Sequence, residues 1–240
     1  MKIVQLLLLL ACLQTQAAAH AQATFFNSRG DFAATLGASI TDDYENPGYR
    51  PSQLTVLNDD KMTSVLRETR YTATYIPNWN IISTANGLPN NHFYCAGCNG
   101  TFDLTFTYAS VGSSNGVFGV GFDIYDNHGT SSGYLPMRAL INLGDGSTLN
   151  VQLPLHQYSS GADYVFFGIT SAAEIASIQI VNSPNSSASF AIDNLTIGTA
   201  VPEPTSFLLL LVGMATVMTI NTSRAGSRKH APSPSRLGDA

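Results

Sequence analysis

Short segments in which apolar and polar residues alternate, separated by turn residues, dominate the centre of this 240-residue chain. The clearest runs from Thr101 to Tyr108, where every second residue is aromatic or leucine, so these side chains would share one face of a strand. Similar reasoning predicts strands at 116–125, 137–143, 148–153, 164–169, 175–181 and 190–197, and an edge strand at 64–71. Because no long helical segments alternate with them, the pattern predicts an all-β fold, an antiparallel β-sandwich of jelly-roll type.

Turn residues and glycines refine this expectation. Gly144-Asp145-Gly146-Ser147 joins two of the predicted strands and is typical of a hairpin turn. Gly119 and Gly121 lie within a third strand and predict a bulge or a close approach of the backbone to a neighbour. The one short helix that we expect runs from Ser28 to Leu36, with Ser28 as its N-cap.

The N-terminal residues have the order of a secretory signal peptide. Lys2 supplies the positive charge, an apolar run ends near Leu13, and Ala21-Gln22-Ala23 is the expected cleavage site, so residues 1–23 would be removed. The apolar run of about eleven residues is shorter than the roughly 20 that a spanning helix needs. The alternative is a lipoprotein signal, because Leu9-Leu10-Ala11-Cys12 approximates a lipobox.

The C-terminal residues follow a three-part order. Pro202-Glu203-Pro204 comes first, an apolar segment at 206–220 follows, and a basic cluster occupies 224–229. The prolines would end any preceding strand, and the basic residues favour a cytoplasmic end for a transmembrane helix at 206–220. Residues 230–240 are expected to form a disordered tail. An ordinary tail anchor is the alternative.

This three-part order, over residues 201–229, resembles the PEP-CTERM sorting signal of Gram-negative bacteria that make exopolysaccharide. The resemblance implies that an exosortase, a membrane transpeptidase, acts at Pro202-Glu203-Pro204 after export through the inner membrane. It implies a location on the cell surface or in the extracellular matrix, with transient anchoring by the C-terminal helix. The tail here runs on to Ala240, beyond the usual stop after the basic cluster.

Residues 24–200, the expected secreted domain, resemble a group of uncharacterised PEP-CTERM surface proteins. The resemblance rests on four segments, namely Asp42-Asp43-Tyr44-Glu45, Tyr94 to Gly100, Phe166-Phe167-Gly168-Ile169 and Phe190 to Leu195. It implies a jelly-roll-like sandwich and no established activity. The domain holds six Lys and Arg against fourteen Asp and Glu, a net charge of −8, and this acidic balance argues against nucleic acid and anionic lipid as partners.

Two cysteines, Cys95 and Cys98, remain in the expected secreted domain. An exported domain meets an oxidising compartment, so we expect them to form a local disulfide. A redox Cys-x-x-Cys motif would lie between a strand and a helix of an α/β fold, and a zinc site would need two more ligands at matching spacing. The sequence shows neither feature.

Carboxylates suggest a structural calcium site. Asp43 and Glu45 come early in the domain, and Asp193 lies in an apolar setting in the last predicted strand. Calcium prefers hard oxygen ligands, so these three residues are the candidate ligands. The alternative is that Asp193 caps a turn or faces solvent. A pair of carboxylates could also serve polysaccharide hydrolysis.

Aromatic residues suggest a sugar-binding surface. Tyr75, Trp79 and Tyr134 are the candidates, because sugar rings stack on aromatic faces as apolar surface does. The alternative places Trp79 in the core. Gly129-Thr130-Ser131-Ser132-Gly133 matches the G-x-S-x-G pattern, but it joins two predicted strands and is expected to be a loop without catalytic function.

The three histidines of the domain, His92, His128 and His156, have no metal-binding spacing and are expected to be solvated. Together these features predict a non-enzymatic protein that associates with exopolysaccharide as a matrix or interaction protein. The alternatives are a calcium-stabilised carbohydrate-binding module and a secreted polysaccharide hydrolase.

Overall fold

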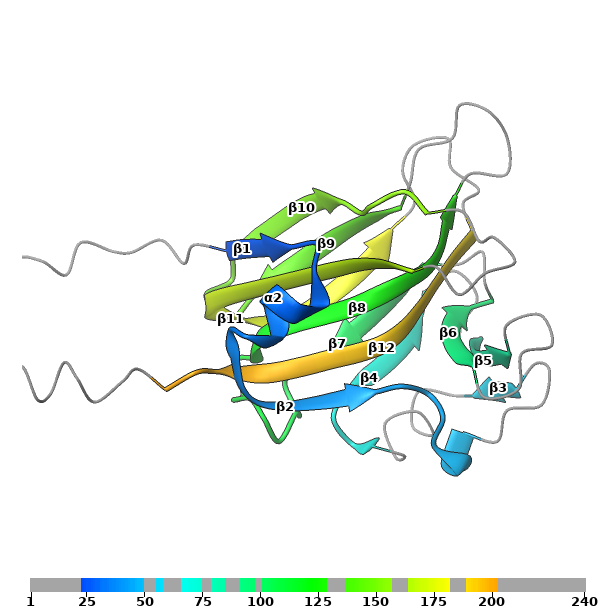
Figure 1. Ribbon diagram of the computed structural model, residues 1–240, viewed down its shortest axis with the longest axis horizontal. Helices are drawn as coiled ribbons and strands as arrows, with labels where there is room; N and C mark the ends of the chain where they lie inside the picture. Colours follow the sequence, from blue (N-terminus) through cyan, green and yellow to red (C-terminus); the bar gives the residue numbers. More distant parts are fainter. Residues whose placement is uncertain are drawn as a thin grey trace, which may run out of the picture. The chain divides into compact units, whose positions relative to one another are not determined.

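The computed structural model describes residues 23–49, 55–57, 66–74, 79–84, 91–97, 101–128, 137–156, 164–181 and 189–202. The chain divides into two compact units, Met1–Val201 and Pro202–Ala240, and the first holds the elements described below. The twelve strands among the described residues belong to one sheet (Figure 1). Every pair of these strands is antiparallel. The all-β, antiparallel prediction is therefore confirmed.

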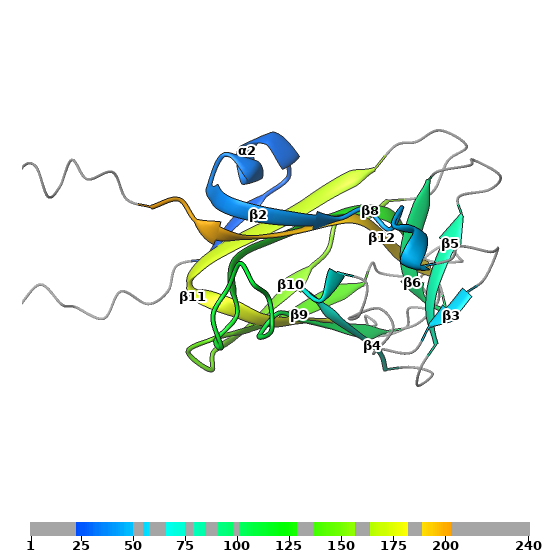
Figure 2. The same cartoon turned by 90° about the horizontal axis from the view of Figure 1, so that it is seen from below.

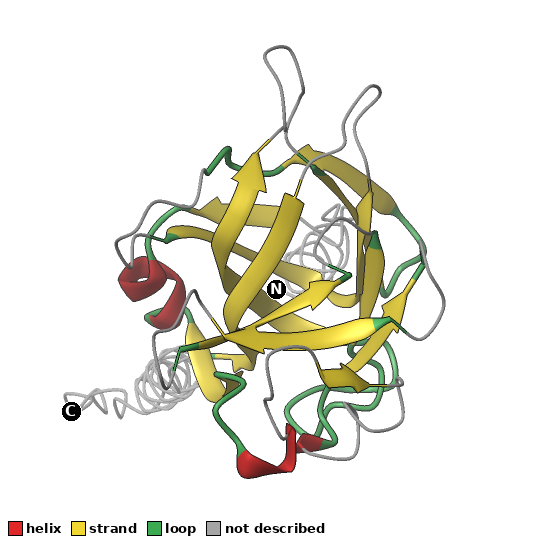
Figure 3. Cartoon of the chain, turned by 90° about the vertical axis from the view of Figure 1, so that its right-hand side faces the viewer, coloured by secondary structure: helices red, strands yellow, loops and turns green. Residues whose placement is uncertain are grey.

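The elements in chain order are β1 (Ala23–Phe26), α2 (Arg29–Ala33), β2 (Leu36–Asp42), the 3-10 turn η1 (Pro47–Tyr49), β3 (Thr55–Leu57), β4 (Arg70–Ala73), β5 (Asn80–Thr84), β6 (His92–Ala96), β7 (Phe102–Thr105), β8 (Val117–His128), β9 (Arg138–Leu143), β10 (Thr148–Gln152), β11 (Val165–Val181) and β12 (Ser189–Ala200). Strands surround the interior in the end-on view (Figure 3). The two named helical segments, α2 and η1, are both short.

The long strand β11 belongs to both layers of the domain (Figure 2). Its first half pairs with β1 and β8, and β8 continues the layer to β12, which pairs with β2 and β6. Its second half pairs with β9 and β7, and these continue to β10 and β4. We call the two layers the β8 layer and the β9 layer. The main apolar core includes residues from the strands of both layers.

Two predicted strands, 164–169 and 175–181, are in fact this single strand. β11 continues from Val165 to Val181 without ending between them. Glu174 adopts a positive φ of 61°, and the pairing with β9 shifts register between Ile175 and Ser177. The irregularity lets one strand change partners without ending.

Other local predictions gave the correct type of element but the wrong bounds. The strand predicted at 101–108 ends at Thr105, because a turn follows it, and Tyr108 is consequently 61% exposed. The predicted helix is confirmed with Ser28 as its N-cap, but it ends at Ala33, and Leu36 begins β2. β2 then runs from Leu36 to Asp42.

The hairpin at Gly144–Ser147 and the close approach at Gly121 are confirmed. The Leu143 amide donates to the Ser147 carbonyl across the turn between β9 and β10. A Cβ atom at Gly121 would lie 2.7 Å from the Phe166 ring and 2.8 Å from the Phe32 ring, so the glycine lets these rings lie directly on the β8 layer. In the part of the chain that the structure describes, no helix has the length and apolar character to span a bilayer, and the predicted segment 206–220 lies outside that part.

Candidate functional site

Trp79 lies immediately before β5 and is 38% exposed, so it is not a core residue. Asn80 pairs with Ala96 on β6, and this register places Trp79 opposite Gly97. A Cβ atom built on Gly97 would lie 2.9 Å from Cε3 of the indole. The indole therefore packs against the backbone of the turn that follows β6.

Gly97 meets two requirements of this turn. Its φ of +63° lies in the left-handed region that side chains rarely adopt, and its missing side chain leaves space for the indole. Two residues earlier, Cys95 is disulfide-bonded. Cys98, its predicted partner, lies outside the described residues, so the pairing stays a prediction. Tyr75 and Tyr134, the other candidate sugar-binding residues, also lie outside them.

A small buried cluster with two aromatic rings packs against β5 and β6, the strands next to Trp79 and Gly97. Ile81 and Cys95 face each other across the two strands and pack with Phe93 and Tyr125. The rings of Phe93 and Tyr125 stack at 4.5 Å with 13° between their planes. Because this cluster is packed, the strand pair that carries Trp79 is held firmly against the domain.

Asp193 lies on β12 directly opposite Asp123 on β8 and is only 4% exposed. Its Oδ1 accepts a 2.6 Å hydrogen bond from the Asn194 amide. Burial raises the pKa of Asp193 to about 7, and repulsion from Asp123 and Glu45 adds to this effect. Glu45 and Asp193, two of the predicted calcium ligands, are therefore close enough for their charges to interact.

Glu45 uses both carboxylate oxygens on His92. The His92 backbone amide donates to Oε1 at 2.7 Å, and the ring Nδ1 lies 2.5 Å from Oε2. His92 lies on β6 and is buried, so our prediction that it is solvated was wrong. The carboxylate supplies the polar partner that the buried ring requires. The side chain of His128 lies outside the described residues, and His156 is half-buried.

The three predicted calcium ligands do not converge as a metal site would require. Asp43 is exposed, and its Oδ1 accepts a hydrogen bond from the Glu45 amide at 3.1 Å. Among the described residues, no group of three or more His, Cys, Asp or Glu side chains could hold a metal ion. With both Glu45 oxygens bonded to His92, the residues present fit a protein-only network better than a calcium site.

Arg29 partly neutralises this acidic region. Its Nη2 lies 3.0 Å from Asp123 Oδ2 and donates to the Asn194 carbonyl at 3.0 Å. Asn194 adopts a positive φ of 51° where the β12–β8 pairing shifts register. Arg29 therefore joins α2 to the irregular part of β12. Our sequence reasoning did not single out Asp123, although its position between apolar residues of a predicted strand was a usable signal.

A second buried carboxylate, Asp42, lies at the end of β2 and is 6% exposed. Its Oδ2 accepts hydrogen bonds from the Tyr49 hydroxyl at 2.6 Å and the Tyr71 hydroxyl at 3.1 Å. Its Oδ1 accepts one from the Tyr44 amide at 3.2 Å. Burial raises the pKa of Asp42 to about 6, although these hydrogen bonds oppose the rise. The carboxylate ties β2, η1 and β4 together.

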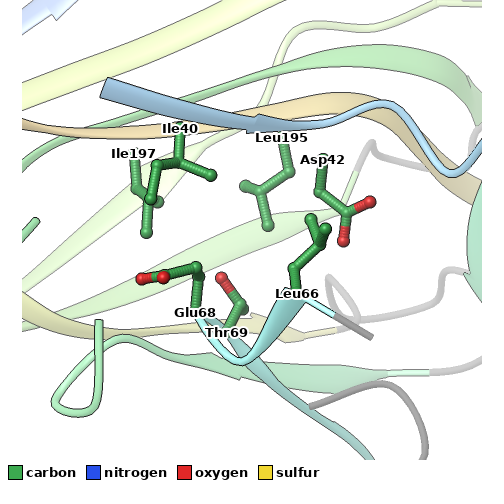
Figure 4. A pocket seen from close by; sticks show the side chains of 7 residues that line it. All are labelled: Ile40, Asp42, Leu66, Glu68, Thr69, Leu195 and Ile197. Carbon is green, nitrogen blue, oxygen red and sulfur yellow. The ribbon is translucent and has the colours of Figure 1, made fainter. Parts of the chain in front are cut away.

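Beside Asp42 is a small cavity of about 10 Å³, which is about the room that one water molecule needs. Figure 4 shows the residues that line it, namely Ile40, Asp42, Leu66, Glu68, Thr69, Leu195 and Ile197. The cavity is too small for a sugar or any other organic ligand.

No protein-family model, curated protein or solved structure matches this chain. The described residues present an exposed indole on a supported strand pair, and two buried carboxylates whose oxygens are bonded within the protein.

Proposed function

We propose that this chain is an exported surface protein, sorted by an exosortase, which associates with extracellular polysaccharide without acting on it as an enzyme. The order of an N-terminal signal, a β domain and a Pro-Glu-Pro tail supports the export and sorting steps. The boundary between the two compact units falls between Val201 and Pro202, at the start of the proposed sorting signal. Val201 is 49% exposed, which suits access by a processing enzyme.

We also propose that the domain is a jelly-roll-like sandwich. The support is the long strand β11, which belongs to both layers and so joins them as strands do in folded-over sheets. β12 pairs with three strands, β2, β6 and β8, and these pairings fit a curved sheet.

The observation that carries the binding proposal is the exposure of Trp79 over Gly97. An indole that packs on one side against a backbone turn leaves its remaining surface available for stacking with a sugar ring. The stacked cluster of Phe93 and Tyr125 stiffens the adjoining strands, so little conformational entropy would be lost on binding.

Binding of the purified full chain to a panel of bacterial exopolysaccharides and plant glycans, with and without calcium, tests this function. We expect binding that does not require calcium, and a loss of about tenfold in affinity for Trp79→Ala. Tyr108→Ala is the matched control, because Tyr108 is also an exposed aromatic residue. Release of new reducing ends from any glycan would instead support the hydrolase alternative.

A further inference from the structure

An open groove lies where strands of both layers meet, and it has a volume of about 390 Å³. Phe25 of β1, Val151 of β10 and Phe166 and Phe167 of β11 contribute to its lining. Pockets that bind small ligands have volumes of about 300–1,000 Å³, so the groove could hold part of a polymer chain. Phe25 is 49% exposed, so part of its ring is open to solvent.

The groove is built on a rigid base. The rings of Phe25 and Phe167 lie 6.2 Å apart, and Phe167 is buried in the core. Phe166 lies under the Arg29 guanidinium, 4.8 Å from its ring centroid, and a Cβ atom at Gly168 would approach the same ring to 2.7 Å. Because neighbours fix Phe166 and Phe167, the lining would not collapse when a ligand leaves.

The lining is uncharged in a domain that is strongly acidic. Every described residue that lines the groove is apolar or carries an amide. The amides belong to Asn27 and Gln152, both exposed, and each side chain can both donate and accept hydrogen bonds. The domain's net charge of −8 disfavours an anionic polymer, whereas an uncharged polymer meets no opposing charge here.

We propose that this groove binds an uncharged polysaccharide, with a sugar ring stacked on Phe25 and hydroxyl groups bonded to Asn27 and Gln152. The proposal rests on the proposed function and adds a second polysaccharide-binding region, separate from the one at Trp79. An aromatic ring with amides beside it matches a sugar, which has an apolar CH face edged by hydroxyls.

The test titrates the full chain, kept in a mild detergent, with soluble uncharged hexasaccharides of glucose and of mannose, and measures affinity by calorimetry. We expect Phe25→Ala to weaken binding by about tenfold and Gln152→Ala to weaken it measurably, while Phe25→Trp retains it. Tyr108→Ala serves as the control that removes an exposed ring elsewhere. Added salt should leave the affinity unchanged. Thermal melts establish whether each variant is folded. If Phe25→Ala does not fold, Gln152→Ala provides the test.

The outcomes separate the two proposals. If the native chain binds uncharged glycans and neither Phe25→Ala nor Gln152→Ala weakens binding, the groove is not the site and the proposed function stands. The same conclusion follows if the chain binds only charged polysaccharides in a salt-sensitive way, or if Phe25→Ala only disrupts self-association of two chains. If the native chain binds no polysaccharide at all, both proposals are wrong.

Discussion

The indole of Trp79 packs so closely against Gly97 that a single added methyl group on the glycine would lie 2.9 Å from the ring. The contact links the only tryptophan of the chain to the turn that begins after the disulfide-bonded Cys95. Position 97 consequently controls both the turn and the exposed indole, and it is the most direct place to test the proposed binding surface.

We expect Gly97→Ala to lower the free energy of unfolding by about 2–4 kcal/mol, because it combines a left-handed backbone strain with overpacking against the indole. Gly146→Ala is the matched control, since Gly146 also has a positive φ, +85°, but a Cβ atom there meets nothing within 4 Å. Urea unfolding of both variants separates the two contributions. Equal losses would show that Trp79 moves away freely and is not held by the turn.

Stability should depend on pH through Asp193. Its pKa is about 7 in the folded domain and about 3.8 in the unfolded chain, so folding favours the protonated form. Its contribution to stability is fully present below pH 3.8 and is lost as the pH rises through 7. We expect Asp193→Asn to be more stable than the native chain at pH 8, by on the order of 3 kcal/mol, and to lose this advantage towards pH 4. Melting curves across this range decide the matter; a constant difference at every pH would contradict the assignment.

The Tyr49 hydroxyl should matter most when Asp42 is ionised. Tyr49→Phe removes the 2.6 Å hydrogen bond and leaves a buried carboxylate with fewer donors, so we expect a loss of about 1–3 kcal/mol at pH 8. The loss should be smaller at pH 4.5, below the Asp42 pKa of about 6, where the carboxyl is mostly neutral. Chemical denaturation at both pH values measures the difference. Asp42→Asn is the reference background, in which the pH dependence of the Tyr49→Phe effect should disappear.

Calcium should leave the melting temperature of the domain nearly unchanged. Both oxygens of Glu45 are bonded to His92, and Asp43 faces solvent, so little of the predicted ligand set is available. Melting curves in millimolar calcium and in chelator provide the measurement. A rise of several degrees in calcium that Glu45→Gln and Asp193→Asn both abolish would restore the calcium-site hypothesis.

Processing should depend on the Pro202-Glu203-Pro204 motif. In a host that carries an exosortase, intact mass of the mature protein should show loss of the segment that contains 206–220. We expect Glu203→Ala to abolish this loss, so that the protein stays in the membrane fraction. Substitution of Thr205, just outside the motif, is the control. Unaltered processing of Glu203→Ala would indicate that the segment is an ordinary anchor.

Local patterning predicted several strands and missed others. β7, β9 and β10 were predicted because their more and less buried residues alternate, which imposes a period of two on the sequence. β8 and β12 were predicted from their apolar and aromatic residues, although nearly all of their described residues are buried on both faces. β6 was missed because all five of its residues are buried, so it shows no alternation. β1, β3 and β5 are too short to have a reliable pattern.

The all-β class, the hairpin at Gly144–Ser147 and the helix cap at Ser28 could be predicted from the sequence, because these features depend on residues close together in the chain. Three relationships could be found only in the folded domain: Asp193 lies opposite Asp123, His92 is buried beside Glu45, and Phe25 and Gln152 line one groove. These relationships join residues far apart in sequence, and strand pairing sets them. No local spacing encodes such a partner, and the free energy of burying each side chain depends on that partner.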